Sequence, residues 1–175
     1  VHMAEDLLEQ ARLADSLGDD SITKGSHYST PDYQALQQIP LLARLTGEVK
    51  RARLNAGIVI LPLHKPLDLA EQLATLDILC NGRLIFGVGI GYREVEFNAF
   101  GTSQKERGAR TTENLIAIKR LWSEDYVQMK GTHFELNKAV CWPKPVQKPH
   151  PPIWIGANAN IAIARAAELG DCWYI

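Results

Sequence analysis

Apolar and polar residues follow two different rhythms along this chain. Residues 3–17 and 66–82 place leucine and alanine at spacings of three and four, which predicts amphipathic helices. Residues 53–61 and 83–88 are instead nearly continuous runs of apolar residues, as in strands that are buried on both faces. The chain therefore changes between helix and strand within short distances.

The same alternation extends over the rest of the chain. It is typical of parallel βαβ units with the helices outside the sheet. Counting gives about five strands, whereas a closed eight-stranded barrel takes about 250 residues. The sequence thus predicts an α/β fold, either an incomplete barrel or a smaller open sheet. The further predicted elements are strands at 20–23, 151–156 and 171–175, and helices at 31–46, 107–122 and from about 159.

One stretch interrupts this rhythm, at about residues 123–150. Residues 127–136 alternate around Gly131 as in a β-hairpin, and the proline-rich segment 142–149 follows as an extended traverse. We interpret the stretch as an insertion within one domain that covers residues 1–175.

Composition and net charge exclude several classes of protein. Of the 175 residues, 46% are hydrophobic and 22% are charged, with a net charge of −1, as in an ordinary soluble globular protein. We therefore expect no nucleic-acid partner and no membrane partner, since the apolar runs are too short to span a bilayer. The 3 cysteines are scattered without a metal-binding spacing. We expect reduced thiols, no metal site and a cytoplasmic location.

Three glycines, Gly87, Gly89 and Gly91, close the apolar run that begins at Arg83. A dinucleotide-binding turn has the spacing G-x-G-x-x-G, but Tyr92 stands where its third glycine would fall. Glycine also permits positive φ and close approach of another group to the backbone. Because the carboxyl end of a barrel strand lies on the ligand-binding face, we expect this turn to line a site.

Several short motifs occur in order around this turn. They are Pro66, Leu76-Asp77, Cys80-Asn81-Gly82-Arg83, Gly87–Gly91, Glu96-Phe97 and Phe100-Gly101. Together they resemble the bacterial luciferase-like flavin-dependent monooxygenase superfamily, including its deazaflavin-dependent oxidoreductase branch. The similarity covers roughly residues 10–175. It implies a luciferase-like (β/α)8 barrel of the TIM type, present here as an incomplete set of about five βα units.

The resemblance also implies a function. It implies a flavin-dependent monooxygenase that uses reduced FMN and dioxygen on a small organic substrate, with a separate flavin reductase as partner. The sister branch implies an alternative, hydride transfer with the deazaflavin coenzyme F420. An alternative of another class is a truncated, non-catalytic fragment that binds flavin or assists assembly. A homodimer packed through the early helices is also implied, and unpaired sheet edges favour association as well.

Gly156, Ala157, Asn158 and Ala159 join a predicted strand to a predicted helix. With Asn158 as the N-cap, the free N–H groups of the first helical turn form an anion site. In the resembled family this turn helps to hold the flavin phosphate, so these four residues are predicted cofactor contacts. A plain capped helix is the alternative.

Two other strand ends supply predicted cofactor contacts. Gly89 and Gly91 let the cofactor approach without an intervening Cβ, and Tyr92 is able to hydrogen-bond its phosphate or the substrate. At the end of the strand at 53–61, the resembled family carries a bulge, often with a non-prolyl cis peptide, against which the flavin ring rests. Ile60 and Leu61 correspond to it here, with core packing as the alternative.

His27 follows the first predicted strand and is the predicted catalytic residue. An imidazole acts as acid, base or hydrogen-bond donor near neutral pH, and the histidine usual in the family falls at this position. Other charged residues are assigned structural roles, with ion pairs expected near the start of the helix at 107–122, to neighbours such as Glu96. This structural set is Asp77, Arg83, Glu96, Arg107, Arg110 and Glu113.

Overall fold

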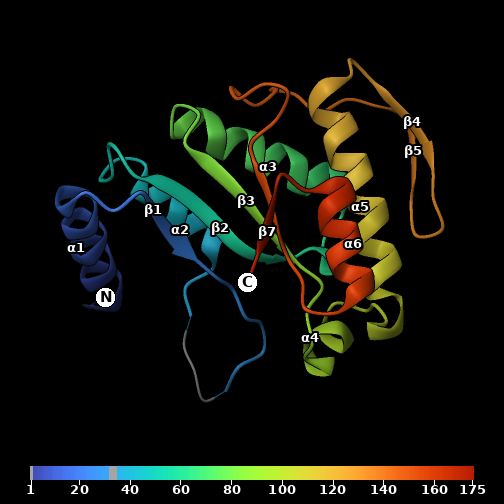
Figure 1. Ribbon diagram of the computed structural model, residues 1–175, viewed down its shortest axis with the longest axis horizontal. Helices are drawn as coiled ribbons and strands as arrows, with labels where there is room; N and C mark the ends of the chain where they lie inside the picture. The colour runs from blue at the N-terminus through green and yellow to red at the C-terminus, as the bar shows by residue number, and fades with distance from the viewer. Residues whose placement is uncertain (1, 32–34) are drawn as a thin grey trace.

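The computed structural model describes residues 2–31 and 35–175, and a five-stranded parallel sheet forms the centre of this part (Figure 1). The strand order is β1-β2-β3-β6-β7, and each neighbouring pair runs parallel. All of these carboxyl ends therefore meet at one edge. The strands are β1 (Ser21–Lys24), β2 (Arg53–Ile60), β3 (Leu84–Gly89), β6 (Ile153–Gly156) and β7 (Cys172–Tyr174).

Helices pack against one face of this sheet, except for the short helix α4, whose Phe97 packs against Ile60 and Leu63 at the end of β2. The strand side chains that meet them are every second residue, as the period of a strand requires; they include Leu54, Ala56, Leu84, Phe86, Val88, Ile153 and Ile155. The helices are α1 (His2–Leu17), α2 (Gln38–Leu45), α3 (Pro66–Leu79), α4 (Glu94–Ala99), α5 (Arg107–Ser123) and α6 (Asn160–Leu169). Two short 3₁₀ turns are η1 (Leu61–Leu63) and η2 (Gln104–Glu106).

Trp122 of α5 anchors the helical layer to the sheet. Its ring is fully buried and meets Phe86 of β3 edge to face, with 5.7 Å between ring centroids. Its Nε1 donates a hydrogen bond of 3.0 Å to the carbonyl of Ala70 in α3. Trp122 thus joins α5 to both β3 and α3. Burying a large apolar side chain of this kind stabilises a fold by about 3 kcal/mol.

The edge opposite the strand carboxyl ends is held by polar side chains. Asp77 is buried and accepts hydrogen bonds from the backbone N–H and the side-chain amide of Gln147, at 3.0 and 2.7 Å. Arg83 donates to the carbonyls of Val49 and Ala52. Both residues therefore have the structural roles expected for them.

The predicted hairpin is present as β4 (Val127–Lys130) and β5 (Glu135–Ala139), which pair antiparallel. It lies beside α5, away from the parallel sheet (Figure 1). Val127 and Leu136 are buried in the same core as the sheet.

The predicted helix at 31–46 is wrong at its beginning, because α2 begins only at Gln38. Pro40 explains the difference: a proline lacks the N–H group and fits only the first turn of a helix. Tyr33, placed on one face of that predicted helix, lies outside the described residues. The short helix α4 was not predicted, since its 6 residues are too few to show a helical period.

The α/β fold with about five parallel strands is otherwise confirmed, with strand bounds within a residue or two of the prediction. Within the described part of the chain, no helix is both long enough and apolar enough to cross a membrane.

Candidate functional site

A cavity of about 770 Å³ lies at the carboxyl edge of the sheet. We call it the strand-end cavity. Each strand of the sheet contributes to its lining near its last residue: Lys24, Ile60, Gly89, Gly156 and Tyr174. In parallel barrels this edge carries the ligand site, so the cavity lies where the sequence predicted a site.

The predicted site residues gather here, with one exception. Those that line the strand-end cavity are His27, Ile60, Gly89, Gly91, Tyr92, Gly156, Ala157, Asn158 and Ala159. Leu61 is the exception: it begins η1, is fully buried in the core and does not line the cavity. The prediction that Leu61 contacts the cofactor is therefore wrong, and the alternative, that Leu61 packs in the core, is correct.

The floor of the cavity is a bulge in β2. The register between β2 and β3 shifts between Ala56 and Val59, and the Gly57–Ile58 peptide is cis. The bulge and cis peptide expected at Ile60 and Leu61 therefore lie a few residues earlier. A Cβ added to Gly89 would lie 2.7 Å from Ile58 Cγ2, and one added to Gly156 would lie 3.0 Å from Ile58 Cδ1. The two glycines thus make room for Ile58.

The turn after β3 is shaped by Gly91, whose φ is +71°. A Cβ there would lie 2.6 Å from Ile60 Cγ2, so both the backbone conformation and the space require glycine. The next residue, Tyr92, is 71% exposed, and its ring meets His27 edge to face with 6.0 Å between centroids. Its side chain therefore lies at the rim of the cavity.

The amino end of α6 faces the cavity. Its N-cap is Ala159, with extended backbone and no capping side chain, so the expectation of Asn158 as N-cap is wrong by one residue. The chain stays extended for one residue more, and Asn158 is left exposed at the cavity wall. The free N–H groups of this helix end are able to bind an anion.

Arg107 begins α5 and also lines the cavity. Its guanidinium has no carboxylate partner among the described residues, so the ion pair expected between Arg107 and a neighbour such as Glu96 is not formed. Near this helix start, ion pairs are formed by Arg110 with Glu106 and by Glu113 with His133. Sequence reasoning missed Arg107 and Lys24 as lining residues. The sequence held one indication for Arg107: it follows the glycine turn that ends β3, so the chain there is still close to the carboxyl edge of the sheet.

His27 is held by a buried carboxylate. Its Nδ1 lies 3.0 Å from Glu96 Oε1, and the same oxygen accepts a hydrogen bond of 2.9 Å from the Tyr28 backbone N–H. Arg93 approaches this oxygen at 3.6 Å. Glu96 is fully buried, and its Oε2 has no hydrogen-bond partner among the described residues. Glu96 thus pairs with His27 and Arg93, as expected of a structural residue, but it does so as a fully buried group. Its contact with His27, which lines the cavity, was not predicted.

A sequence model of the luciferase-like monooxygenase family matches residues 2–175. The chain belongs to this family. The oxygenase component of flavin-dependent trigonelline monooxygenase from Acinetobacter baylyi is 33% identical over 156 residues, which are 88% of this chain and 43% of that protein. F420-dependent glucose-6-phosphate dehydrogenase from Amycolatopsis mediterranei is 31% identical over 176 residues, 95% of this chain and 51% of that protein.

A solved structure gives the same result in three dimensions. An F420-dependent secondary alcohol dehydrogenase in complex with an F420-acetone adduct matches with a TM-score of 0.85 and 27% identity, covering 96% of this chain and 52% of that one. The predicted resemblance and the luciferase-like barrel fold are thus confirmed. The relatives include flavin-dependent and F420-dependent enzymes, the two cofactor classes predicted. This luciferase-like chain spans about half the length of the curated relatives it matches.

In this luciferase-like chain, aromatic side chains pack around Tyr28, the residue that follows His27. Tyr28 meets Phe100 edge to face at 4.6 Å between centroids, and its hydroxyl lies 3.5 Å from His64 Nε2. Burial raises the pKa of Tyr28, with the charge of Glu96 adding to the effect. Burial lowers the pKa of His64. Both side chains are therefore uncharged near pH 7.

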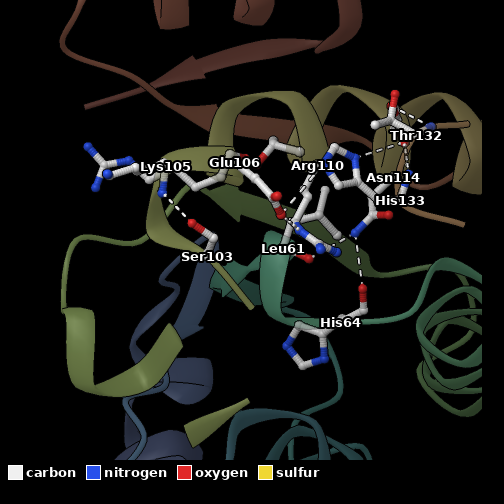
Figure 2. Close-up of polar contacts among 12 residues, drawn as sticks. Leu61, His64, Ser103, Lys105, Glu106, Arg110, Asn114, Thr132 and His133 are labelled. Atoms are coloured by element: carbon white, nitrogen blue, oxygen red, sulfur yellow. Dashed lines mark hydrogen bonds and ion pairs between the residues drawn. The ribbon is translucent and has the colours of Figure 1, made fainter. Parts of the chain in front are cut away.

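The turn that follows β2 is fixed from α5. Figure 2 shows the side-chain amide of Asn114 between two backbone carbonyls, those of Leu61 and His64, to which it donates at 3.0 and 3.1 Å. Because η1 continues directly from Ile60, these bonds hold the cavity end of β2 in place.

A second histidine–carboxylate pair lies outside the cavity. His133 Nδ1 is 3.1 Å from Glu113 Oε2, and the backbone N–H groups of Thr132 and His133 donate to the same carboxylate. Figure 2 shows His133 and Thr132 near Glu106 and Arg110 of the neighbouring helical segment. This pair joins the β4–β5 turn to α5 and serves structure. Among the described residues there is no cluster of His, Cys, Asp or Glu placed to hold a metal ion.

Proposed function

We propose that this protein is a flavin-dependent oxidoreductase, a monooxygenase that binds reduced FMN in the strand-end cavity and acts with dioxygen on a small organic substrate. The observation that carries the proposal is the cavity itself, which lies at the carboxyl ends of all the described parallel strands and has a glycine-lined floor. Its volume is within the range of cofactor sites.

The residues present fit such a cofactor. Ile58, Ile60 and Ile90 give the cavity apolar surface for a flat ring. Gly89 and Gly156 carry no Cβ that would displace Ile58 from beneath it. The amino end of α6 and the guanidinium of Arg107, which has no carboxylate partner in the described part of the chain, would hold the phosphate, since both favour negative charge. When bound, reduced FMN supplies the electrons for the reaction with dioxygen.

His27 is the proposed catalytic residue. It lines the strand-end cavity and also a second hollow of about 360 Å³ together with Tyr28 and Met3. A histidine between two hollows is placed to exchange a proton or a hydrogen bond with a ligand in either one. We propose that the smaller hollow admits the substrate.

A second function is favoured by a specific observation. The alternative is hydride transfer with F420, and two of the similar proteins are named as F420-dependent dehydrogenases. The same anion site and apolar floor suit either cofactor, because both carry a flat ring and a phosphate. A third alternative, a non-catalytic flavin-binding or assembly fragment, is supported by the exposed outer strands β1 and β7.

Partners and location form part of the proposal. The relative from Acinetobacter is named as an oxygenase component, which supports a separate flavin reductase that delivers reduced FMN. The outer strands support a homodimer. The thiols Cys80, Cys141 and Cys172 are free, which supports a cytoplasmic location.

Titration of the purified protein with FMN and, separately, with F420 tests the proposal. Binding is followed by quenching of cofactor fluorescence, in wild type and in Arg107→Gln. Micromolar binding of FMN alone supports the monooxygenase, and binding of F420 alone supports hydride transfer. Arg107→Gln should weaken binding about tenfold, the loss of one charge-assisted contact. Binding of neither cofactor would contradict both enzyme functions and would support the alternative of a non-catalytic fragment.

A further inference from the structure

We propose that Glu96 is a positioning residue for His27. It fixes the tautomer and direction of the imidazole, so that His27 presents Nε2 to the strand-end cavity as a hydrogen-bond acceptor that favours the reduced form of a bound flavin. The identity of this ligand rests on the proposed function. The arrangement of the two side chains rests on geometry alone.

The first step concerns the proton on His27. Glu96 Oε1 already accepts a hydrogen bond from the Tyr28 backbone N–H, and in the same acceptor role its contact of 3.0 Å with His27 Nδ1 is one in which Nδ1 donates. In a neutral imidazole the other nitrogen then carries a lone pair. Nε2 of His27 has no partner among the described residues, and the ring lines the strand-end cavity. The lone pair is therefore available to a ligand.

The second step concerns the rigidity of the carboxylate. Glu96 is fully buried, and its Oε1 also accepts from the Tyr28 N–H at 2.9 Å and lies 3.6 Å from Arg93. Arg93 in turn donates to the Tyr28 carbonyl at 3.1 Å. Glu96 and Arg93 thus clamp the backbone of the residue next to His27, and the ring inherits that fixed direction.

The third step concerns the other carboxylate oxygen. Oε2 of Glu96 is buried and has no partner among the described residues. A buried polar atom without a partner is unfavourable, so a carboxylate at this position calls for an explanation. The contact of its other oxygen with His27 Nδ1 is the explanation that the geometry offers.

The last step concerns the ligand. Reduced flavin carries ring N–H groups that oxidised flavin lacks, so an acceptor in the cavity stabilises the reduced form selectively. An Nε2 that carried a proton would lose this selectivity. Glu96, which does not line the cavity, therefore acts on the ligand only through His27.

Nitrogen-15 NMR of the histidine rings in the cofactor-free protein tests the positioning role. In wild type, the neutral His27 ring should carry its proton on Nδ1. In Glu96→Gln this form should become less populated while the His133 ring is unchanged, and Glu113→Gln, the matched control, should change His133 alone. A wild-type ring protonated on Nε2, or an unchanged His27 in Glu96→Gln, would overturn the proposal. The wild-type result does not require that any variant folds.

Anaerobic titration with reduced FMN and aerobic titration with oxidised FMN test the selectivity. Wild type should prefer the reduced form, and Glu96→Gln and His27→Gln should each lower that preference by about fivefold, the effect of one hydrogen bond. The double variant should lose no more than either single variant, because both remove the same contact. Losses that multiply would contradict the coupling. If wild type binds neither form, the proposed function fails, while the NMR result still decides the role of Glu96.

Discussion

The two histidine–carboxylate pairs of this molecule use the same contact with opposite burial. His27 Nδ1 lies 3.0 Å from Glu96, and His133 Nδ1 lies 3.1 Å from Glu113. The Glu96 side chain is 0% exposed and that of His27 is 35% exposed, whereas His133 is 8% exposed and Glu113 is 19% exposed. A buried acid holds a histidine out toward a cavity, and a buried histidine ties a turn to a helix. Burial, rather than the contact itself, separates the two roles.

The largest effect is expected when the acid of each pair is replaced by alanine, because the two replacements should destabilise the fold by different amounts. Glu96→Ala leaves the Tyr28 N–H without its acceptor and the Arg93 guanidinium without its carboxylate, so it should lower the free energy of unfolding by about 3 kcal/mol. Glu113→Ala should lower it by about 1 kcal/mol, because water replaces part of what is lost. Urea denaturation followed by tryptophan fluorescence measures both. Equal losses would contradict the distinction drawn from burial.

Chemical modification should rank the two histidines. Diethyl pyrocarbonate should modify His27 about fourfold faster than His133, in proportion to their exposed fractions of 35% and 8%. Peptide mass spectrometry resolves the two sites. Bound FMN should protect His27 and leave the rate at His133 unchanged. Protection of both histidines, or of neither, would argue against the strand-end cavity as the flavin site.

The pH dependence of stability should report on Glu113. Burial opposes its ionisation, but the hydrogen bonds from Thr132 and His133 together outweigh burial and hold the pKa of Glu113 below its usual range. Its stabilisation is therefore present above the unfolded value of about 4.3 and is lost as the pH falls through the lower folded value. Wild type should exceed Glu113→Gln by about 1 kcal/mol at neutral pH. That difference should shrink in acid; a difference that grows below pH 4 would contradict the assignment.

The smallest effect is expected at Glu106. It pairs with Arg110 at 2.9 Å and lies 3.7 Å from His133 Nε2, but it is largely exposed. Glu106→Gln should therefore lower the free energy of unfolding by only about 0.3 kcal/mol, as for other exposed ion pairs. The His27 ring spectrum should not change. A loss as large as that of Glu113→Ala would mean that His133 depends on both acids.

Only part of this site could be predicted from the sequence alone. The glycine turn and the strand ends could be predicted, because a parallel sheet brings its carboxyl ends to one edge. The pairing of His27 with Glu96 could not be predicted, because 69 positions separate the two residues and only the tertiary fold joins them. Glu96 was assigned a structural role for the same reason.

Local chemistry accounts for the errors in the fold. The long helices α3 and α5 show clear periods and were predicted close to their observed bounds. The beginning of α2 was missed because the position of Pro40 in a first turn outweighs a weak apolar pattern before it. The place of the β2 bulge was missed because it depends on which residues of β3 and β6 lack a side chain, and that information lies in other strands.

The packing of Ile58 against Gly89 and Gly156 has a consequence for how this protein can evolve. A methyl group at position 89 would lie 2.7 Å from Ile58 Cγ2, which is too close for both groups to remain where they are, whereas one at position 156 would lie 3.0 Å from Cδ1, the movable end of the Ile58 side chain. An alanine at position 89 should therefore arise along a lineage only after Ile58 has become smaller. Position 156 should accept alanine with a small shift of Ile58, so it is not bound to that order.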